Sequence, residues 1–149
     1  ELYNQLYLDK YSMHNPQFNI DFIKLAWNQK LLQLFVLKKE GRIDGVVGFF
    51  CRNGVMTTPF FGYDLSVPQK IGIYRMLSAK LILEAEQRGL LLHQSSGAAE
   101  FKRCRGAVPC LEYNAVYTKH MPFRNKLGWR LVEYLANKIG AYLVIKMKL

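Results

Sequence analysis

Two short turns divide residues 31–64 into three apolar segments, and this pattern constrains the fold more than any other feature of the chain. Glu40-Gly41 separates LLQLFVLKKE from RIDGVVGFFCR, and Asn53-Gly54 separates RIDGVVGFFCR from VMTTPFFGYDL. Asn-Gly between apolar segments is a strong signal for a tight hairpin turn, because both residues tolerate positive φ angles. The pattern therefore predicts three consecutive antiparallel strands.

Amphipathic segments surround these strands. Apolar residues recur every three or four positions over residues 2–11, 19–30 and 68–88, as on the buried face of a helix. We expect further elements in this order: a strand at 90–95 covered on both sides, a short helix from residue 97, an alternating strand at 108–118, a helix at 123–139 that stops at Gly140, and a closing strand at 141–149. This order predicts an α/β, or α+β, fold with a mixed, mostly antiparallel central sheet flanked by helices on both faces.

A chain of 149 residues, half of them apolar, fits one globular domain over residues 1–149. It starts at Glu1 rather than at methionine, so a fragment of a longer protein is a second interpretation. No stretch reaches the roughly 18 apolar residues of a membrane span, and the start lacks the order of a secretion signal. Cys51, Cys104 and Cys110 form no CxxC pair and have no histidine at ligand spacing, which favours a cytoplasmic setting without disulfides or metal.

The formal net charge of +10 favours anionic partners. Candidates are an anionic small-molecule or nucleotide-linked substrate, an RNA such as tRNA, and an acidic membrane surface. Because the cations are spread from Lys10 to Lys148, a solvated basic surface without a specific partner explains the charge equally well.

The sequence QKIGIY, residues 69–74, stands at an expected helix start. The first turn of a helix presents N–H groups and a positive dipole end, and glycine lets a phosphate approach closely. We therefore predict that Gln69, Lys70 and Gly72 bind a phosphorylated cofactor, with Tyr74 crowding the approach. The alternative is that Gly72 only permits close packing of the helix on the sheet.

A second candidate segment, SSGAAEFKRCRGA, covers residues 95–107. Ser95 and Ser96 precede its helix and expose backbone amides, while Phe101 is expected to anchor the helix in the core. An ammonium at Lys102 would bind a phosphate or stabilise the oxyanion of an acyl transfer. The segment's cations are Lys102, Arg103 and Arg105. The alternative is that they only stabilise the negative end of a short helix.

Three further side chains are candidates for work on a substrate. Glu112 stands between apolar residues of the expected strand at 108–118, and a buried carboxylate there would accept the proton of an amine. A salt bridge to a neighbouring arginine is the alternative. Tyr113 either lines an acceptor pocket or packs in the core, and Asp64 either caps the following helix or contacts the acceptor.

The order of elements resembles that of the GNAT N-acetyltransferase superfamily over almost the whole chain, apart from the usual first strand. GNAT proteins carry Gln or Arg, then x-x-Gly-x-Gly/Ala, at the helix that holds the pyrophosphate of acetyl-CoA. Gln69 and Gly72 match this motif, and Tyr74 departs from it. The resemblance implies that acetyl-CoA or another acyl-CoA binds at this helix start.

GAAEFKRCRGA resembles more closely the FemAB-like, or BioF2-like, branch of the same superfamily, in which a Gly-Ala-rich helix ends in Phe-Lys followed by glycine. On the GNAT motif Asn-x-x-Ala-x-x-x-Tyr-x-x-x-Gly, the four fixed places fall on Ser95, Ala98, Lys102 and Gly106. The FemAB-like resemblance implies a catalytic role for Lys102. It also implies that the chain is the second of two GNAT-like domains.

Together these observations predict an N-acyltransferase that moves an acyl or aminoacyl group from acyl-CoA or aminoacyl-tRNA to an amine. The predicted residues are Lys102 and Glu112 for catalysis, Gln69, Lys70, Gly72, Ser95 and Ser96 for the cofactor, and Asp64, Arg103, Arg105 and Tyr113 for the substrate. One alternative is a non-catalytic GNAT-like module that binds a nucleotide-linked ligand or RNA. Another is an interaction domain that docks on anionic membrane.

Overall fold

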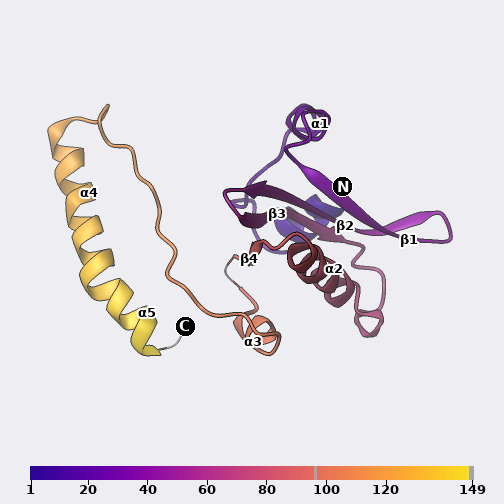
Figure 1. Ribbon diagram of the computed structural model, residues 1–149. Helices are drawn as coiled ribbons and strands as arrows, with labels where there is room; N and C mark the ends of the chain where they lie inside the picture. Colours follow the sequence, from indigo (N-terminus) through magenta and orange to yellow (C-terminus); the bar gives the residue numbers. More distant parts are fainter. Residues whose placement is uncertain (96, 148–149) are drawn as a thin grey trace. The chain divides into compact units, whose positions relative to one another are not determined.

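The computed structural model describes residues 1–95 and 97–147 (Figure 1). The chain divides into two compact units, Glu1–Ser95 and Ser96–Leu149. The first unit contains the sheet, and the described residues of the second form helices and loops. In the described part of the chain, no helix combines the length and the apolar character that crossing a membrane requires.

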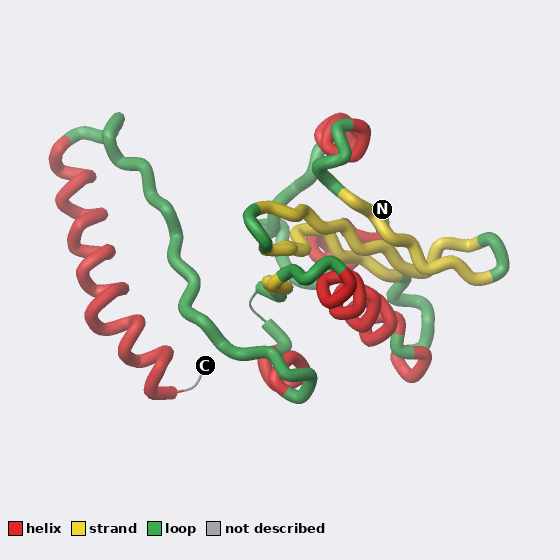
Figure 2. The backbone as a smooth tube through the Cα atoms, viewed as in Figure 1, coloured by secondary structure: helices red, strands yellow, loops and turns green. Residues whose placement is uncertain are grey.

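The first unit contains a four-stranded sheet in the order β1-β2-β3-β4 (Figure 2). Its strands are β1 (Gln33–Lys39), β2 (Arg42–Arg52), β3 (Val55–Tyr63) and β4 (Leu91–His93). The first three are antiparallel, and β4 returns parallel to β3 after helix α2. Residues at both turns have positive φ, with values of 49° and 82° at Glu40-Gly41 and 50° and 77° at Asn53-Gly54. The predicted meander, its turns and the mixed sheet are thus confirmed.

A bulge divides β3 into two parts. Gly48 pairs with Phe60 and Phe50 pairs with Thr57, so residues 58 and 59 of β3 together oppose Phe49. Residue 59 is a proline, which suits a bulge because it has no N–H to donate to the hydrogen-bond ladder of the sheet. β4 pairs with β3 only from Val55 to Thr57. Among the described residues, no strand pairs with residues 58–63 of β3 on the edge opposite β2. These residues lead into the connection to α2.

Helical segments lie on both faces of the sheet. Helix α2 (Ile73–Gln87) packs so closely on β2 that a Cβ added to Gly45 would lie 3.0 Å from Ile73 and Leu77. The π-helix η1 (Asn4–Asp9) begins after Tyr3, which stacks at 5.0 Å on Phe60. Alternation along β3 turns Phe60 away from α2. The predicted covering of both faces is therefore confirmed.

The core of the first unit forms between β2, β3 and α2. Val47, Phe49 and Met56 are fully buried, and α2 adds Leu77 and Leu81. Helix α1 (Ile20–Asn28) contributes less than its amphipathic pattern predicts, since Ala26 is its buried residue while Phe22 and Trp27 are 48% and 58% exposed. The strand predicted at 90–95 also differs, because β4 has three residues and Leu91 is 70% exposed rather than covered.

The second unit begins with the short helix α3 (Ala99–Arg103) and ends with α4 (Phe123–Leu135), the π-helical turn η3 (Ala136–Gly140) and α5 (Ala141–Met147). The strand predicted at 108–118 is wrong, because the segment is an extended loop whose Tyr113 is 73% exposed (Figure 2). The predicted stop at Gly140 and the closing strand are also wrong. Gly140 keeps a helical backbone in η3, and the helix continues to Met147.

Candidate functional site

The connection between β3 and α2 begins with a turn held by Asp64. Its Oδ1 accepts the backbone N–H of Ser66 at 2.8 Å and the Ser66 hydroxyl at 2.6 Å, while its own N–H donates to the Asp44 carbonyl at 2.9 Å. The Ser66 hydroxyl and N–H lower the pKa of the Asp64 carboxyl below its ordinary value. Asp64 is therefore ionised at neutral pH, and it fixes the start of the connection without capping α2 itself.

Gly72 separates α2 from the single 3-10 turn η2 (Gln69–Ile71). The Gly72 N–H donates to the Gln69 carbonyl at 3.0 Å, and the Gly72 carbonyl accepts from Met76 N–H, also at 3.0 Å. The helix expected to open at Pro68 thus starts at Ile73. Gly72 has φ of 79°, so its place is a left-handed turn that glycine adopts without strain.

The start of α2 presents amide donors. The N–H groups of Ile73 and Arg75 lie in the first turn of α2, where the helix itself offers them no carbonyl acceptor. Such donors, together with the positive end of the helix dipole, make a place where a phosphate binds favourably. The Gly72 N–H, by contrast, is already bonded to the Gln69 carbonyl, and the phosphate contact predicted for Gln69, Lys70 and Gly72 stays a prediction.

Arg75 adds a charge to this helix start, and sequence reasoning missed it. A Cβ placed on Gly72 would lie 2.8 Å from Nε and from Nη2 of Arg75, so the guanidinium lies over the glycine. Nη2 also donates to the Lys70 carbonyl at 3.3 Å. A cation is unfavourable in the first turn of a helix because the dipole is positive there. An arginine in the first turn of an expected helix was therefore the feature of the sequence that could have indicated an anion site.

Tyr74 does not lie where the sequence suggested. Its ring centroid is 5.2 Å from that of Phe61 and 6.4 Å from that of Tyr63, so the side chain packs toward β3. The group that crowds Gly72 is instead the guanidinium of Arg75. Of the other predicted cofactor residues, Gln69 and Lys70 are exposed on η2.

Tyrosine hydroxyls gather near this connection, which the sequence did not indicate. Burial, followed by the charges of neighbouring tyrosines including Tyr74, raises the pKa of Tyr7 above its ordinary value. Burial also raises the pKa of Tyr63, with Tyr11 and Tyr74 as smaller causes. Tyr7 of η1 and Tyr63 of β3 thus supply phenols that remain protonated donors at neutral pH.

The remaining predicted residues lie elsewhere. Ser95 follows β4 with φ of 57°, and Ser96 lies outside the described residues. Five predicted residues belong to the second unit: Lys102, Arg103, Arg105, Glu112 and Tyr113.

Lys102 and Glu112 lie within electrostatic reach of each other. Partial burial lowers the pKa of Lys102, and the attraction of Glu112 opposes that shift. Glu112 itself is exposed on the extended loop rather than buried in a strand, so the expected apolar surroundings are absent. The structure thus shows an electrostatic influence of Glu112 on Lys102, while the catalytic roles of both residues stay predictions.

The two arginines of α3 differ in their contacts. Arg105 lies with Cζ 3.5 Å from the ring centroid of Phe101, and its Nη1 donates to the Phe101 carbonyl at 2.8 Å. This geometry fits the alternative that the cation stabilises the end of its own helix. Arg103 is exposed in the last turn of α3. The ring of Phe101 is half-buried and is covered by Arg105.

The comparisons with known proteins support the fold. No protein-family model matches the sequence, and a search of curated proteins finds no relative. A predicted acetyltransferase from Clostridium acetobutylicum, crystallised with acetyl-CoA, has a similar structure with a TM-score of 0.53. The two chains are 13% identical, and the alignment covers 72% of this chain and 81% of the other. The likeness is one of fold, and it agrees with the GNAT-like architecture that the order of elements implies.

Proposed function

We propose that the chain transfers an acyl group from acyl-CoA to an amine and binds the coenzyme diphosphate at the start of α2. The observation that carries the proposal is the position of the Arg75 guanidinium beside Gly72, at the helix start where α2 presents its first-turn N–H groups. A diphosphate carries negative charge and several acceptor oxygens. It therefore matches both the charge and the donors of this helix start.

The fold supports the same assignment. The similar structure from C. acetobutylicum was crystallised with acetyl-CoA. In open sheets, ligands bind where neighbouring strands part. Here β3 loses its pairing with β4 after Thr57 and continues to the connection that carries Gly72.

The reaction needs little beyond orientation and charge stabilisation. The amine nitrogen attacks the thioester carbonyl, the carbon–sulfur bond breaks, and the amine proton ends on the departing sulfur. From the sequence, Lys102 is proposed to stabilise the oxyanion and Glu112 to accept the amine proton. Lys102→Ala should abolish transfer with little change in melting temperature.

The finer assignment within the superfamily also remains a proposal. Residues 97–107 resemble the FemAB-like branch, which favours an aminoacyl-tRNA as a second candidate donor, and the net charge of +10 suits an RNA. Steep salt dependence of tRNA binding, without acetyl-CoA binding, would favour that donor.

Calorimetric titration of the full chain with acetyl-CoA tests the proposal. We expect micromolar affinity in the wild type and a loss of at least about tenfold in Arg75→Ala, as for a charged hydrogen-bond donor to phosphate. Arg52→Ala is the matched control, because Arg52 is an exposed arginine at the far end of β2. Absence of acetyl-CoA binding in the wild type, or an equal loss in both variants, would contradict the donor site.

A further inference from the structure

The second unit ends in a helical segment, residues 123–147, that runs from α4 through η3 into α5. Of residues 123–140, all of which the structure describes, none is buried. Helices of this length are only marginally stable in water by themselves, and most of their stability in proteins comes from covering an apolar face. The apolar side chains of this segment therefore need a surface to cover them.

Leucines recur every four residues along α4. Leu127, Leu131 and Leu135 have exposed fractions of 58%, 59% and 43%. Side chains four residues apart lie on the same face of a helix, so the three leucines form one apolar stripe. Trp129 and Tyr134 on the same helix are also exposed. Tryptophan and tyrosine rings favour the boundary between lipid and water, because they combine an apolar ring with a polar group.

Cations outnumber carboxylates in the same segment. The cations are Arg124, Lys126, Arg130, Lys138 and Lys146. Glu133 is the only carboxylate side chain between residues 123 and 147. Lys126 and Arg130 each precede one of the leucines, so they lie about 100° around the helix from the apolar stripe. Arg124 lies nearer the stripe, where its long stem lets the guanidinium reach outward.

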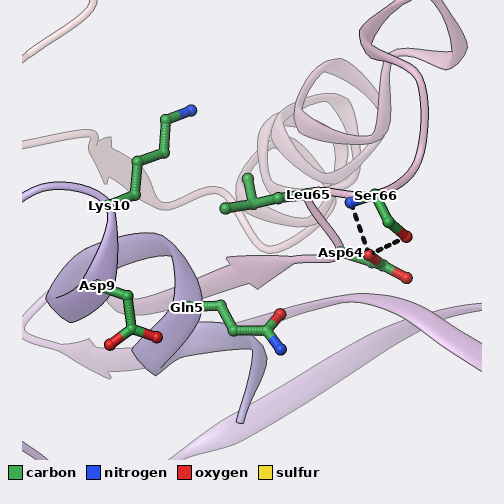
Figure 3. A pocket seen from close by; sticks show the side chains of 6 residues that line it. All are labelled: Gln5, Asp9, Lys10, Asp64, Leu65 and Ser66. Atoms are coloured by element: carbon green, nitrogen blue, oxygen red, sulfur yellow. Dashed lines mark hydrogen bonds between the residues drawn. The ribbon is translucent and has the colours of Figure 1, made fainter.

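The first unit differs in its balance of charge. Residues 1–95 contain eleven cations and eight carboxylates, whereas residues 96–149 contain ten cations and three carboxylates. The ion pairs of the first unit are Arg42–Asp44, Lys80–Glu84 and Arg88–Glu84. Lys10 shares the lining of an open hollow with Asp9 and Asp64 (Figure 3). The excess positive charge of the chain therefore belongs mainly to the second unit.

An anionic lipid surface matches both the apolar stripe and the charge. Amphipathic helices that carry Leu, Phe or Trp on one side and Lys or Arg on the other lie in such surfaces, with the apolar side at the acyl chains. A nucleic acid would bind the cations through its phosphates but would leave the leucines in water. A second copy of the chain would bring like charges together, which is unfavourable.

We propose that residues 123–147 lie in the surface of an anionic lipid bilayer. Leu127, Leu131 and Leu135 contact the acyl chains, and Lys126 and Arg130 bind the anionic headgroups. The inference does not depend on acyl transfer, because it uses no residue of the α2 start.

Co-sedimentation of the full chain with lipid vesicles tests the inference. One set of vesicles contains phosphatidylcholine mixed with phosphatidylserine, and the other contains phosphatidylcholine alone. We expect binding to the mixed vesicles that weakens as salt is added, because salt screens the attraction between the cations and the headgroups. In a Trp27→Phe background, the emission of Trp129 should shift to the blue with the mixed vesicles, since the ring leaves water.

Leu131→Glu should weaken vesicle binding at least about tenfold, because an apolar side chain is replaced by a carboxylate that the headgroups repel. Leu25→Glu is the matched control, since Leu25 is 60% exposed on α1 of the first unit. Lys126→Glu combined with Arg130→Glu should also weaken binding at least about tenfold. Its control is Lys24→Glu, which reverses an exposed charge on α1.

Four results would overturn the inference. The first is equal vesicle binding by Leu131→Glu and Leu25→Glu, and the second is equal binding of the wild type to both kinds of vesicle. The third is a melting temperature without vesicles that falls much further in Leu131→Glu than in Leu25→Glu, because the leucine would then be covered within the protein. The fourth is self-association in solution that Leu131→Glu abolishes, which would make a second copy the occupant.

Acetyl-CoA titration separates this inference from the proposed function. Leu131→Glu should leave acetyl-CoA affinity unchanged, because residues 123–147 do not belong to the α2 start. Vesicle binding without acetyl-CoA binding would contradict the proposed function and support the lipid surface. Acetyl-CoA binding without vesicle binding would overturn the lipid surface alone.

Discussion

The guanidinium of Arg75 lies directly over Gly72, with two of its nitrogens 2.8 Å from the place that a Cβ on the glycine would occupy. The glycine has φ of 79° and forms the left-handed turn that leads into α2. Its missing side chain therefore serves two purposes. It removes the strain of positive φ, and it leaves the space in which a cation lies at the positive end of the helix.

Gly72→Ala should lower both stability and acetyl-CoA affinity. The positive φ alone costs about 1 kcal/mol with alanine, and the new Cβ must displace Arg75. Gly54→Ala is the control, because Gly54 has φ of 77° with no atom within 4 Å of the added Cβ. Urea unfolding should show that the strain of alanine at positive φ lowers the free energy of unfolding by a comparable amount in both variants. Calorimetry should show weaker acetyl-CoA binding only in Gly72→Ala. Equal acetyl-CoA affinities in the two variants would contradict this role of Gly72.

Tyr74→Ala should destabilise the first unit without improving acetyl-CoA affinity. The ring packs on Phe61 and Tyr63, so truncation removes aromatic contacts and costs about 2 kcal/mol. Tyr74→Phe keeps the ring and should lose much less stability. Thermal unfolding and acetyl-CoA titration of both variants provide the measurement. A gain of affinity in Tyr74→Ala would show that the tyrosine obstructs the coenzyme after all.

The sheet was predictable because local turn chemistry specifies a meander. Glu40-Gly41 and Asn53-Gly54 adopt positive φ at the two ends of β2. The strands that these turns connect, β1 with β2 and β2 with β3, pair over most of their length. The break between η2 and α2 was less predictable. A glycine within a segment that has the apolar spacing of a helix is normally predicted to be helical. Gly72 instead forms a left-handed turn just before the first residue of α2.

The second unit was predicted less well for the opposite reason. Residues 108–118 alternate as a strand does, yet a strand also needs a partner, and a pattern of side chains does not supply one. Residues 141–147 are rich in β-branched and aromatic residues but continue the preceding helix through Gly140. Arg75 was missed because its significance depends on the helix start, which the helix-start signal at Pro68 places five residues too early.

Glu84→Gln should destabilise the first unit at neutral pH by about 2 kcal/mol, as expected for loss of hydrogen bonds to charged groups. Glu84 is buried on α2 and accepts from Lys80 Nζ at 2.9 Å and from Arg88 Nε at 2.8 Å, while Arg88 also donates to Gln33 of β1 at 2.7 Å. Unfolding in urea at pH 7 gives the difference. Glu86→Gln, an exposed neighbour on α2, should have little effect.

The pH dependence gives a second check on Glu84. The Lys80 bond, followed by Arg88, lowers the pKa of the Glu84 carboxyl in the folded protein below its ordinary value of 4.5. The unfolded state therefore binds the proton first as pH falls, and the stability due to this group is lost progressively below about pH 5. Wild type and Glu84→Gln should converge in acid. A constant difference from pH 7 to pH 3 would contradict the assigned bonds.

Lys102 should show a pH dependence of the same direction as Glu84, but at higher pH. Burial places its folded pKa below the ordinary value of 10.5, so in the interval between the two values the unfolded state binds more protons. Stability should rise with pH through that interval and level off above about pH 10.5. Because Glu112 opposes the shift, Glu112→Gln should lower the pKa of Lys102 further and reduce stability at neutral pH, where the lysine is charged.

Heteronuclear NMR of the Lys102 side chain measures this pKa directly. Glu100→Gln is the matched control, since Glu100 also carries a carboxylate in the second unit but lies on α3 with Lys102 rather than on the loop. We expect the titration midpoint of Lys102 to fall in Glu112→Gln and to remain unchanged in Glu100→Gln. A midpoint at or above 10.5 in the wild type would contradict the dominant effect of burial, whereas equal shifts in both variants would exclude the pairing. The oxyanion role proposed for Lys102 would then lack its partner, because an ammonium that Glu112 does not hold in place has no fixed position from which to stabilise developing charge.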